Sequence, residues 1–116
     1  MRDTIKKHDD FLPTEMDIDA RSALFFVRAR PTKFQNGGRY GITASKRTFK
    51  FAVHRNRAKR LLRDWIVYNE KHMRNDMDYI FIARYPILDA SRNDGRRAMH
   101  KALLYIKRVH AKQTKQ

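Results

Sequence analysis

The side chains best suited to chemistry in this chain are cationic, and many of them lie in one short segment. Eight bases fall within the 18 residues from 46 to 63, and they are Lys46, Arg47, Lys50, Arg55, Arg57, Lys59, Arg60 and Arg63. The guanidinium group of arginine is a planar fork that pairs with two phosphate oxygens and also stacks on bases. Residues of this type at this density favour binding of a polyanion such as RNA.

The charge around this segment is one-sided. The 44 residues between Asp19 and Asp64 contain 13 lysines and arginines and no acid. Residues 1–22, in contrast, carry six acids against four bases, a net charge of −2. The rest of the 116-residue chain therefore carries +17, which gives the formal total of +15. Because ordinary surfaces mix both signs, a long acid-free window predicts a surface that binds nucleic acid.

Bond-making chemistry has few candidates. His54 stands beside Arg55 and could act as the general base of a small nuclease, an alternative that predicts RNA cleavage by the protein alone. Asp76 and Asp78 could be taken for a metal pair, but at the entry to a strand we interpret them as loop residues. The chain has no cysteine, which excludes disulfides, a thiol nucleophile and a zinc finger. We therefore expect no catalytic residue and no metal held by the protein.

The composition is that of a folded domain. With 41% hydrophobic and 11% aromatic residues, the chain is too apolar for a disordered basic tail. Its length suits one domain over residues 1–116, with the first few residues and 111–116 expected to fray. It shows neither an apolar stretch of about 18 residues nor a signal peptide, so we expect a cytoplasmic protein without a membrane partner.

Several segments have strand or helix signals. Residues 5–19 could form a helix interrupted at Pro13, and residues 23–30 alternate as a strand. That strand would place Phe25, Val27 and Ala29 on one face, and on the other Leu24, Phe26, Arg28 and Arg30. The turn sequence Asn36-Gly37-Gly38 predicts a hairpin return along residues 39–45. The apolar run at 78–84 is typical of a buried strand.

The cationic segment itself has helical periodicity. One stripe is apolar and consists of Ala58, Leu61, Leu62, Trp65 and Ile66. Asn56, Lys59, Arg60 and Arg63 lie roughly opposite that stripe, and Arg55 and Arg57 flank it. A last helix should follow the capping sequence Ser91 to Asp94 and bury Ala98, Ala102, Leu103, Ile106 and Val109. These signals together predict a single α+β domain.

The segment SKRTFKFAVHRNRAKRLLRDW, which ends at Trp65, resembles the protein subunit of bacterial ribonuclease P. That family is marked by a strand ending in a Ser-Lys-Lys-like turn, followed on a helix by Arg-Asn-Arg, Lys-Arg-Leu and a further Arg. The flanks IKKHDDF (5–11), RYGITASKR (39–47) and DYIFIARYP (78–86) are similar to other parts of the family. One departure is Glu15, which stands where relatives often have a second aromatic residue after Phe11.

The resemblance implies a mixed sheet of about four strands with about three helices, in the order α-β-β-β-α-β-α. It also implies a left-handed β-α-β crossover, as in the ribonuclease P protein and a related ribosomal-protein fold, against the usual right-handed rule. The implied function is that of an accessory subunit of an endonuclease. It would bind the catalytic RNA and the 5′ leader of precursor tRNA, while the RNA carries the active site and its Mg²⁺ ions.

Site residues follow from the resemblance by position. The residues implied to bind the RNA subunit are Arg55, Asn56, Arg57, Lys59, Arg60, Arg63, Lys46 and Arg47. The residues implied to bind the leader are Phe11, Phe26, Arg28, Thr43 and Ser45. No obligate protein partner is evident. The alternative from another class is a non-catalytic ribosomal-type structural RNA-binding protein, against which the Arg-Asn-Arg helix with its matching flanks argues.

Overall fold

Five strands form one mixed sheet in the order β1-β4-β5-β3-β2. A computed structural model describes residues 3–5, 14–33 and 37–114 of the chain. The strands are β1 (Asp3–Thr4), β2 (Ile18–Arg21), β3 (Phe25–Pro31), β4 (Arg39–Thr43) and β5 (Met77–Ala83). β3 is antiparallel to β2 and β5, whereas β4 is parallel to β1 and β5.

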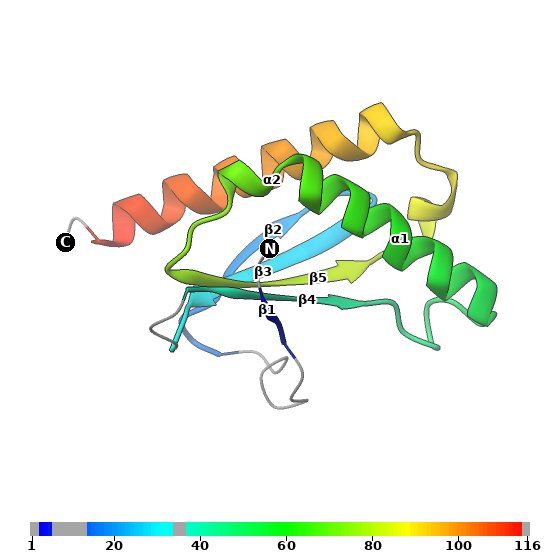
Figure 1. The fold of residues 1–116 in the computed structure, drawn as a ribbon, viewed down its shortest axis with the longest axis horizontal. Helices are drawn as coiled ribbons and strands as arrows, with labels where there is room; N and C mark the ends of the chain where they lie inside the picture. Colours follow the sequence, from blue (N-terminus) through cyan, green and yellow to red (C-terminus); the bar gives the residue numbers. More distant parts are fainter. Residues whose placement is uncertain (1–2, 6–13, 34–36, 115–116) are drawn as a thin grey trace.

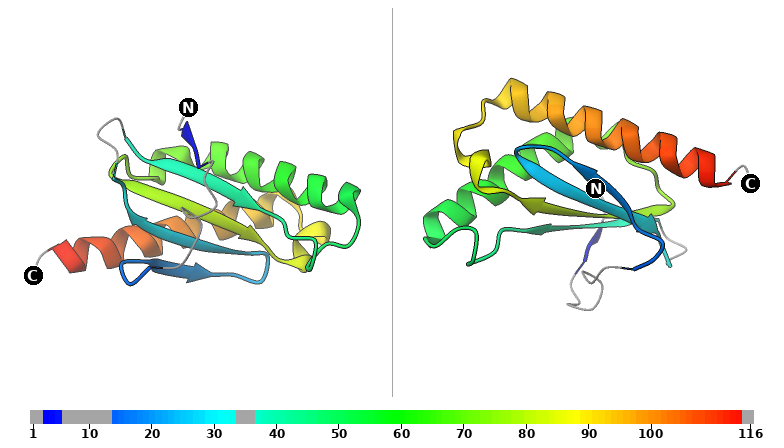
Figure 2. Two further views of the ribbon diagram at one scale, coloured as in Figure 1. Left: turned by 90° about the horizontal axis from the view of Figure 1, so that it is seen from below. Right: turned by 180° about the vertical axis from the view of Figure 1, so that it is seen from behind.

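Two helices, α1 (Ala52–Tyr68) and α2 (Arg92–Thr114), cover one face of this sheet (Figure 1). We call the opposite face, which no helix of the described residues covers, the open face. Short 3-10 helices at Glu70–His72 and Tyr85–Asp89 connect α1 to β5 and β5 to α2. In the left view of Figure 2, β4 and β5 run in the same direction with α1 behind them, which makes the β4-α1-β5 crossover left-handed. The α+β fold and its crossover therefore agree with the expectation from the sequence.

The predicted helix over residues 5–19 is wrong for the part that the structure describes. Residues 6–13 lie outside the described ranges. Beyond them, residues 14–17 form a turn in which the backbone N–H of Thr14 donates to Asp17 Oδ2 at 2.8 Å. β2 follows at once, with Ile18 and Ala20 buried and Asp19 and Arg21 exposed. This alternation has period two and thus belongs to a strand, not to a helix.

The predicted hairpin between β3 and β4 is also wrong. β5 lies between the two strands, pairing antiparallel with β3 and parallel with β4. The physical reason is burial: β5 is the central strand, and six of its seven residues are buried. A local turn signal such as Gly37, which has a φ of 104°, cannot reveal that a strand from 40 residues later will occupy the place beside it.

The alternation within β3 is confirmed. Phe25, Val27 and Ala29 are fully buried beneath the helices, whereas Phe26, Arg28 and Arg30 are half-buried on the open face. The apolar stripes of both helices are confirmed as well. Leu61, Ala98 and Val109 only border the core, and the remaining stripe residues are buried. The core thus lies between the sheet and the two helices.

The two helices meet where Trp65 of α1 packs against Gly95 in the first turn of α2. Trp65 is fully buried, and its ring lies 6.1 Å from the ring of Phe25 on β3. A Cβ atom on Gly95 would overlap the six-membered ring of the indole. α2 begins there because Ser91 Oγ accepts a hydrogen bond from the backbone N–H of Asp94, as the capping sequence predicts.

A histidine pair joins the 3-10 helix at Glu70–His72 to α2. The rings of His72 and His100 lie 4.5 Å apart, edge to face. Burial lowers the pKa of His72 from its ordinary value, and His100, Lys71 and Lys107 lower it further by charge repulsion. In the unfolded chain the imidazole therefore takes up a proton more readily than in the folded protein.

Acidification from pH 7.5 to 5.5 should consequently reduce the free energy of unfolding. The sign follows because a depressed histidine pKa means that the unfolded state binds more protons over this range. We expect His72→Gln to flatten the dependence, measured by urea unfolding monitored by circular dichroism at both pH values. An equal slope in the variant and the parent would contradict this assignment.

Candidate nucleic-acid interface

The outer row of α1, which we define as Asn56, Lys59, Arg60 and Arg63, faces away from the core. Asn56, Arg60 and Arg63 are exposed and Lys59 is half-buried. Within the described ranges, the side chains of Arg60 and Arg63 form no hydrogen bond and no ion pair. This side of the helix therefore presents cations whose hydrogen-bond donors are free for phosphate oxygens.

Arg55 and Arg57, which the sequence predicts as RNA contacts, also bind the protein's own backbone. Arg55 donates to the carbonyl oxygens of Phe49 at 2.9 Å and Lys50 at 3.3 Å, just before the helix begins. Arg57 donates from Nε and Nη2 to the carbonyl oxygen of Leu88, at 3.4 and 3.3 Å. These two arginines fix the entry to α1 and its contact with the Tyr85–Asp89 helix, a role that the sequence did not reveal.

The turn between β4 and α1 holds three further predicted residues. Ser45 Oγ donates to the hydroxyl of Thr48 at 3.0 Å and accepts from its backbone N–H at 3.1 Å. Lys46 and Arg47 are exposed in the same turn. Ser45 thus shapes the turn, and the two bases lie where the end of the sheet passes into the cationic helix.

Two predicted leader residues come together on the open face of the sheet. Strand register aligns Thr43 of β4 with Ile82 of β5, and Ile82 with Phe26 of β3. Arg21 of β2 stands opposite Phe26, and its guanidinium carbon lies 5.1 Å from the centre of that ring. Phe26 and Thr43 therefore share one row across the sheet. A third predicted leader residue, Arg28, lies on the same face of β3, with its guanidinium carbon 5.3 Å from the centre of the Phe26 ring. Phe11 lies outside the described residues.

Ion pairs bind three arginines of the open face, Arg28, Arg30 and Arg39, to acids that the sequence did not connect with them. Arg28 Nε lies 3.2 Å from Asp17 Oδ2 and 3.3 Å from Asp19 Oδ1, and Arg30 Nε lies 3.0 Å from Asp17 Oδ1. Asp78 accepts hydrogen bonds from the backbone N–H and the guanidinium of Arg39, at 2.7 and 3.0 Å. The open face is thus far closer to neutral than the outer row of α1.

The two aspartates before and within β5 have separate roles. Asp78 is buried in the strand, contrary to the expectation of a loop residue, because its carboxylate is paired with Arg39. Asp76 lies in the loop as expected, and hydrogen bonds from Arg74 hold the pKa of its carboxyl below its usual range. In the described part of the chain, no three His, Cys, Asp or Glu residues are grouped to hold a metal ion.

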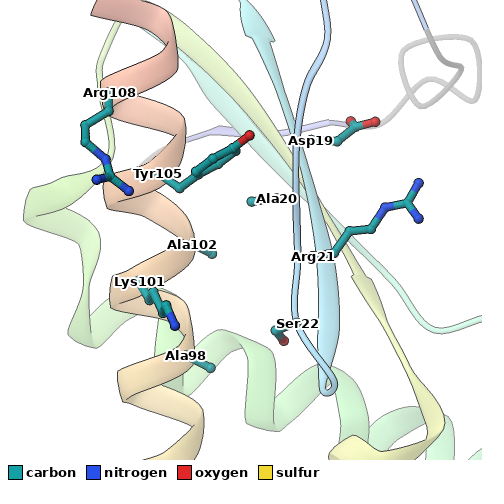
Figure 3. A pocket seen from close by; sticks show the side chains of 9 residues that line it. All are labelled: Asp19, Ala20, Arg21, Ser22, Ala98, Lys101, Ala102, Tyr105 and Arg108. Carbon is teal, nitrogen blue, oxygen red and sulfur yellow. The ribbon is translucent and has the colours of Figure 1, made fainter.

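Two hollows border the open face and its edge. One, of about 450 Å³, is lined by Arg30, Arg39 and Asp78 with residues of the turn at 14–17 and the end of β3. The other, of about 490 Å³, is a groove between β2 and α2 with Ala20, Ala98 and Ala102 along it and Lys101 and Arg108 at its rim (Figure 3). The side chains of Asp19 and Arg21 point away from α2 in this view, which is consistent with their place on the open face.

The nuclease alternative gains no support from the surroundings of His54. Its half-buried imidazole lies edge to face with Phe51, at 5.6 Å between ring centres. Among the described residues no carboxylate is hydrogen-bonded to it, so nothing there orients it as a general base.

The described helices also include none that is long and apolar enough to cross a membrane.

Comparison with known proteins places the chain beside one family. The family model for ribonuclease P matches residues 1–107. The ribonuclease P protein component of Halalkalibacterium halodurans is 33% identical over 86 residues, which cover 73% of this chain and 71% of that protein. The component from Desulforapulum autotrophicum is 30% identical over 102 residues, covering 88% and 86%.

Solved structures give the same picture. The Staphylococcus aureus RNase P protein superposes with a TM-score of 0.72 at 28% identity, covering 90% of this chain and 94% of that one. The RNase P protein from Thermotoga maritima reaches a TM-score of 0.67 over the same shares of both chains. At 20% identity, the latter likeness concerns the fold alone.

Proposed function

The chain belongs to the ribonuclease P protein family and is the protein component of that tRNA-processing ribonucleoprotein, and we propose how it divides its two surfaces between two RNAs. The outer row of α1, with Lys46 and Arg47, binds the ribonuclease P RNA. The open face of the sheet, with Phe26, Arg28 and Thr43, binds the 5′ leader of precursor tRNA. The protein acts in the cytoplasm as an accessory to cleavage and supplies no catalytic group.

The observation that carries this proposal is the difference between the two surfaces. The outer row of α1 offers Arg60 and Arg63, whose side chains have no partner among the described residues, as a site for many phosphates requires. The open face instead offers an aromatic ring bracketed by the guanidinium groups of Arg21 and Arg28, and the charge of Arg28 is paired with Asp17 and Asp19. Such a surface suits unpaired bases, which stack on rings and on guanidinium planes.

We assign the Mg²⁺ ions of the reaction to the RNA subunit. The cationic row of α1 repels divalent cations, whereas the phosphates that it would bind attract them. The carboxylates of Asp17, Asp19 and Asp78 are occupied by arginines. In this proposal the protein aids metal-dependent cleavage only indirectly, by holding the RNAs together.

The experiment that tests the function is reconstitution with a bacterial ribonuclease P RNA at low Mg²⁺ concentration. We expect the protein to restore 5′ processing of a precursor tRNA under conditions in which the RNA alone is inactive. The protein without RNA should leave the same substrate intact. Processing that does not improve on adding the protein would refute the proposal, and cleavage by the protein alone would favour the His54 nuclease.

Phe26→Ala should weaken binding of leader-bearing tRNA to the reconstituted enzyme by about tenfold, the order of magnitude of one lost base stack. Binding of mature tRNA, which has no leader, should not change. Equilibrium binding of the two substrates in Ca²⁺, which slows cleavage, measures both values. An equal loss for both would show that the half-buried Phe26 ring serves the fold rather than the leader.

A further inference from the structure

One buried carboxylate organises the arginines of the open face. The Asp17 side chain is only 6% exposed, although it belongs to a turn at the edge of the sheet. The backbone N–H of Thr14 donates to its Oδ2 at 2.8 Å, and the Thr14 hydroxyl donates to its Oδ1 at 2.7 Å. Because these bonds close a four-residue turn, they hold the carboxylate in place independently of its arginine partners.

Asp17 then holds two arginines at once. Arg28 Nε lies 3.2 Å from Oδ2, and Arg30 lies with Nε 3.0 Å from Oδ1 and donates from Nη2 to Oδ2 at 3.4 Å. The two residues are next neighbours on the same face of β3, so their like charges would repel if nothing lay between them. A carboxylate shared between them removes that repulsion and restricts two long, flexible side chains.

The two arginines lie beside two features of the open face that a nucleotide strand could contact, an aromatic ring and a hollow. Arg28 stands over the ring of Phe26, at 5.3 Å from its centre. Arg30 lines the hollow of about 450 Å³ together with Arg39. Asp17 contacts each of these arginines at Nε, the guanidinium nitrogen next to the aliphatic chain. These contacts fix where each guanidinium group lies.

We propose that Asp17 is a positioning residue for the leader strand: it sets Arg28 and Arg30 in the places from which they contact the leader of precursor tRNA. This inference rests on the proposed function, because it concerns the same open face. It runs against simple electrostatics. Removing a negative charge from a surface that binds a polyanion should strengthen binding, whereas loss of a positioning residue should weaken it.

The sign of the effect therefore decides the matter. We expect Asp17→Asn to weaken binding of leader-bearing tRNA to the reconstituted enzyme by about threefold or more, a fraction of the worth of one base stack. Binding of leaderless tRNA should change little. Asp89→Asn is the charge-matched control, since it removes the same charge from the Tyr85–Asp89 helix, where Asp89 is exposed and forms no ion pair with an arginine of the open face within the described residues. That variant should bind leader-bearing tRNA as well as, or more tightly than, the parent.

Tighter or unchanged binding of leader-bearing tRNA by Asp17→Asn would overturn the inference, and so would an equal loss for both tRNAs. If Asp17→Asn does not fold, Thr14→Val takes its place, because it removes one donor to Asp17 without changing the net charge. It should lower the preference for leader-bearing tRNA in the same direction, and an unchanged preference would overturn the inference. A parent enzyme that shows no such preference would instead refute the proposed function itself.

Discussion

Replacing Gly95 with alanine is expected to lower the free energy of unfolding by about 2 kcal/mol or more, although alanine is the better helix former. Helix propensity favours alanine by roughly 1 kcal/mol. Overpacking a rigid core costs about 1–3 kcal/mol and sometimes more, and here the new Cβ would overlap the buried indole of Trp65. The steric term should win because neither helix can retreat without opening the core between them.

Thermal and urea unfolding monitored by circular dichroism measure this effect. A double-mutant cycle supplies the control: in a Trp65→Leu background the added methyl group no longer overlaps the indole, so Gly95→Ala should then cost much less. Additive losses in the double variant would show that the Gly95 backbone, rather than its contact with Trp65, matters for stability.

Neutralising the outer row of α1 is the second change with a large expected effect. Lys59→Gln, Arg60→Gln and Arg63→Gln, made together, should weaken binding of the ribonuclease P RNA by about a hundredfold or more at low salt. Each lost phosphate contact lowers the slope of log affinity against log salt by roughly 0.7–0.9, so three should lower it by about 2 to 3. The fold should persist, because glutamine is a good helix former and these side chains lie outside the core.

The matched control removes three charges from α2. Lys101→Gln, Lys107→Gln and Lys112→Gln are exposed substitutions that also change the formal charge from +15 to +12. If binding of the RNA depends on where the charges lie and not only on their number, this variant should keep most of the parent's affinity and salt slope. Equal losses in both variants would mean that the RNA responds to net charge alone, and α1 would lose its assigned role.

Local patterns predicted those features that depend on local physics. The 3.6-residue period placed Ala58, Leu62 and Trp65 against the core and the outer row away from it. The period-two alternation of β3 separated Phe26 and Arg28 from the buried residues correctly. The resemblance supplied the crossover hand and the family, neither of which periodicity contains.

Long-range pairing lay beyond the sequence. The insertion of β5 between β3 and β4 depends on which apolar strand gains most from central burial, and no turn sequence encodes that choice. The bonds of Arg57 to Leu88 and of Arg30 to Asp17 span 31 and 13 positions. Gly95 carried no signal either, because its need for a hydrogen side chain arises only from the approach of Trp65.

The division of β3 into a covered and an open side has a consequence for how such a protein can change over generations. The side chains at positions 25, 27 and 29 pack in the core, and those at positions 26, 28 and 30 contact whatever lies on the open face. Substitutions at the second set therefore escape the packing constraint that acts on the first. A lineage, or a randomised library, could alter its preference among RNA strands one open-face residue at a time while inheriting the same scaffold unchanged.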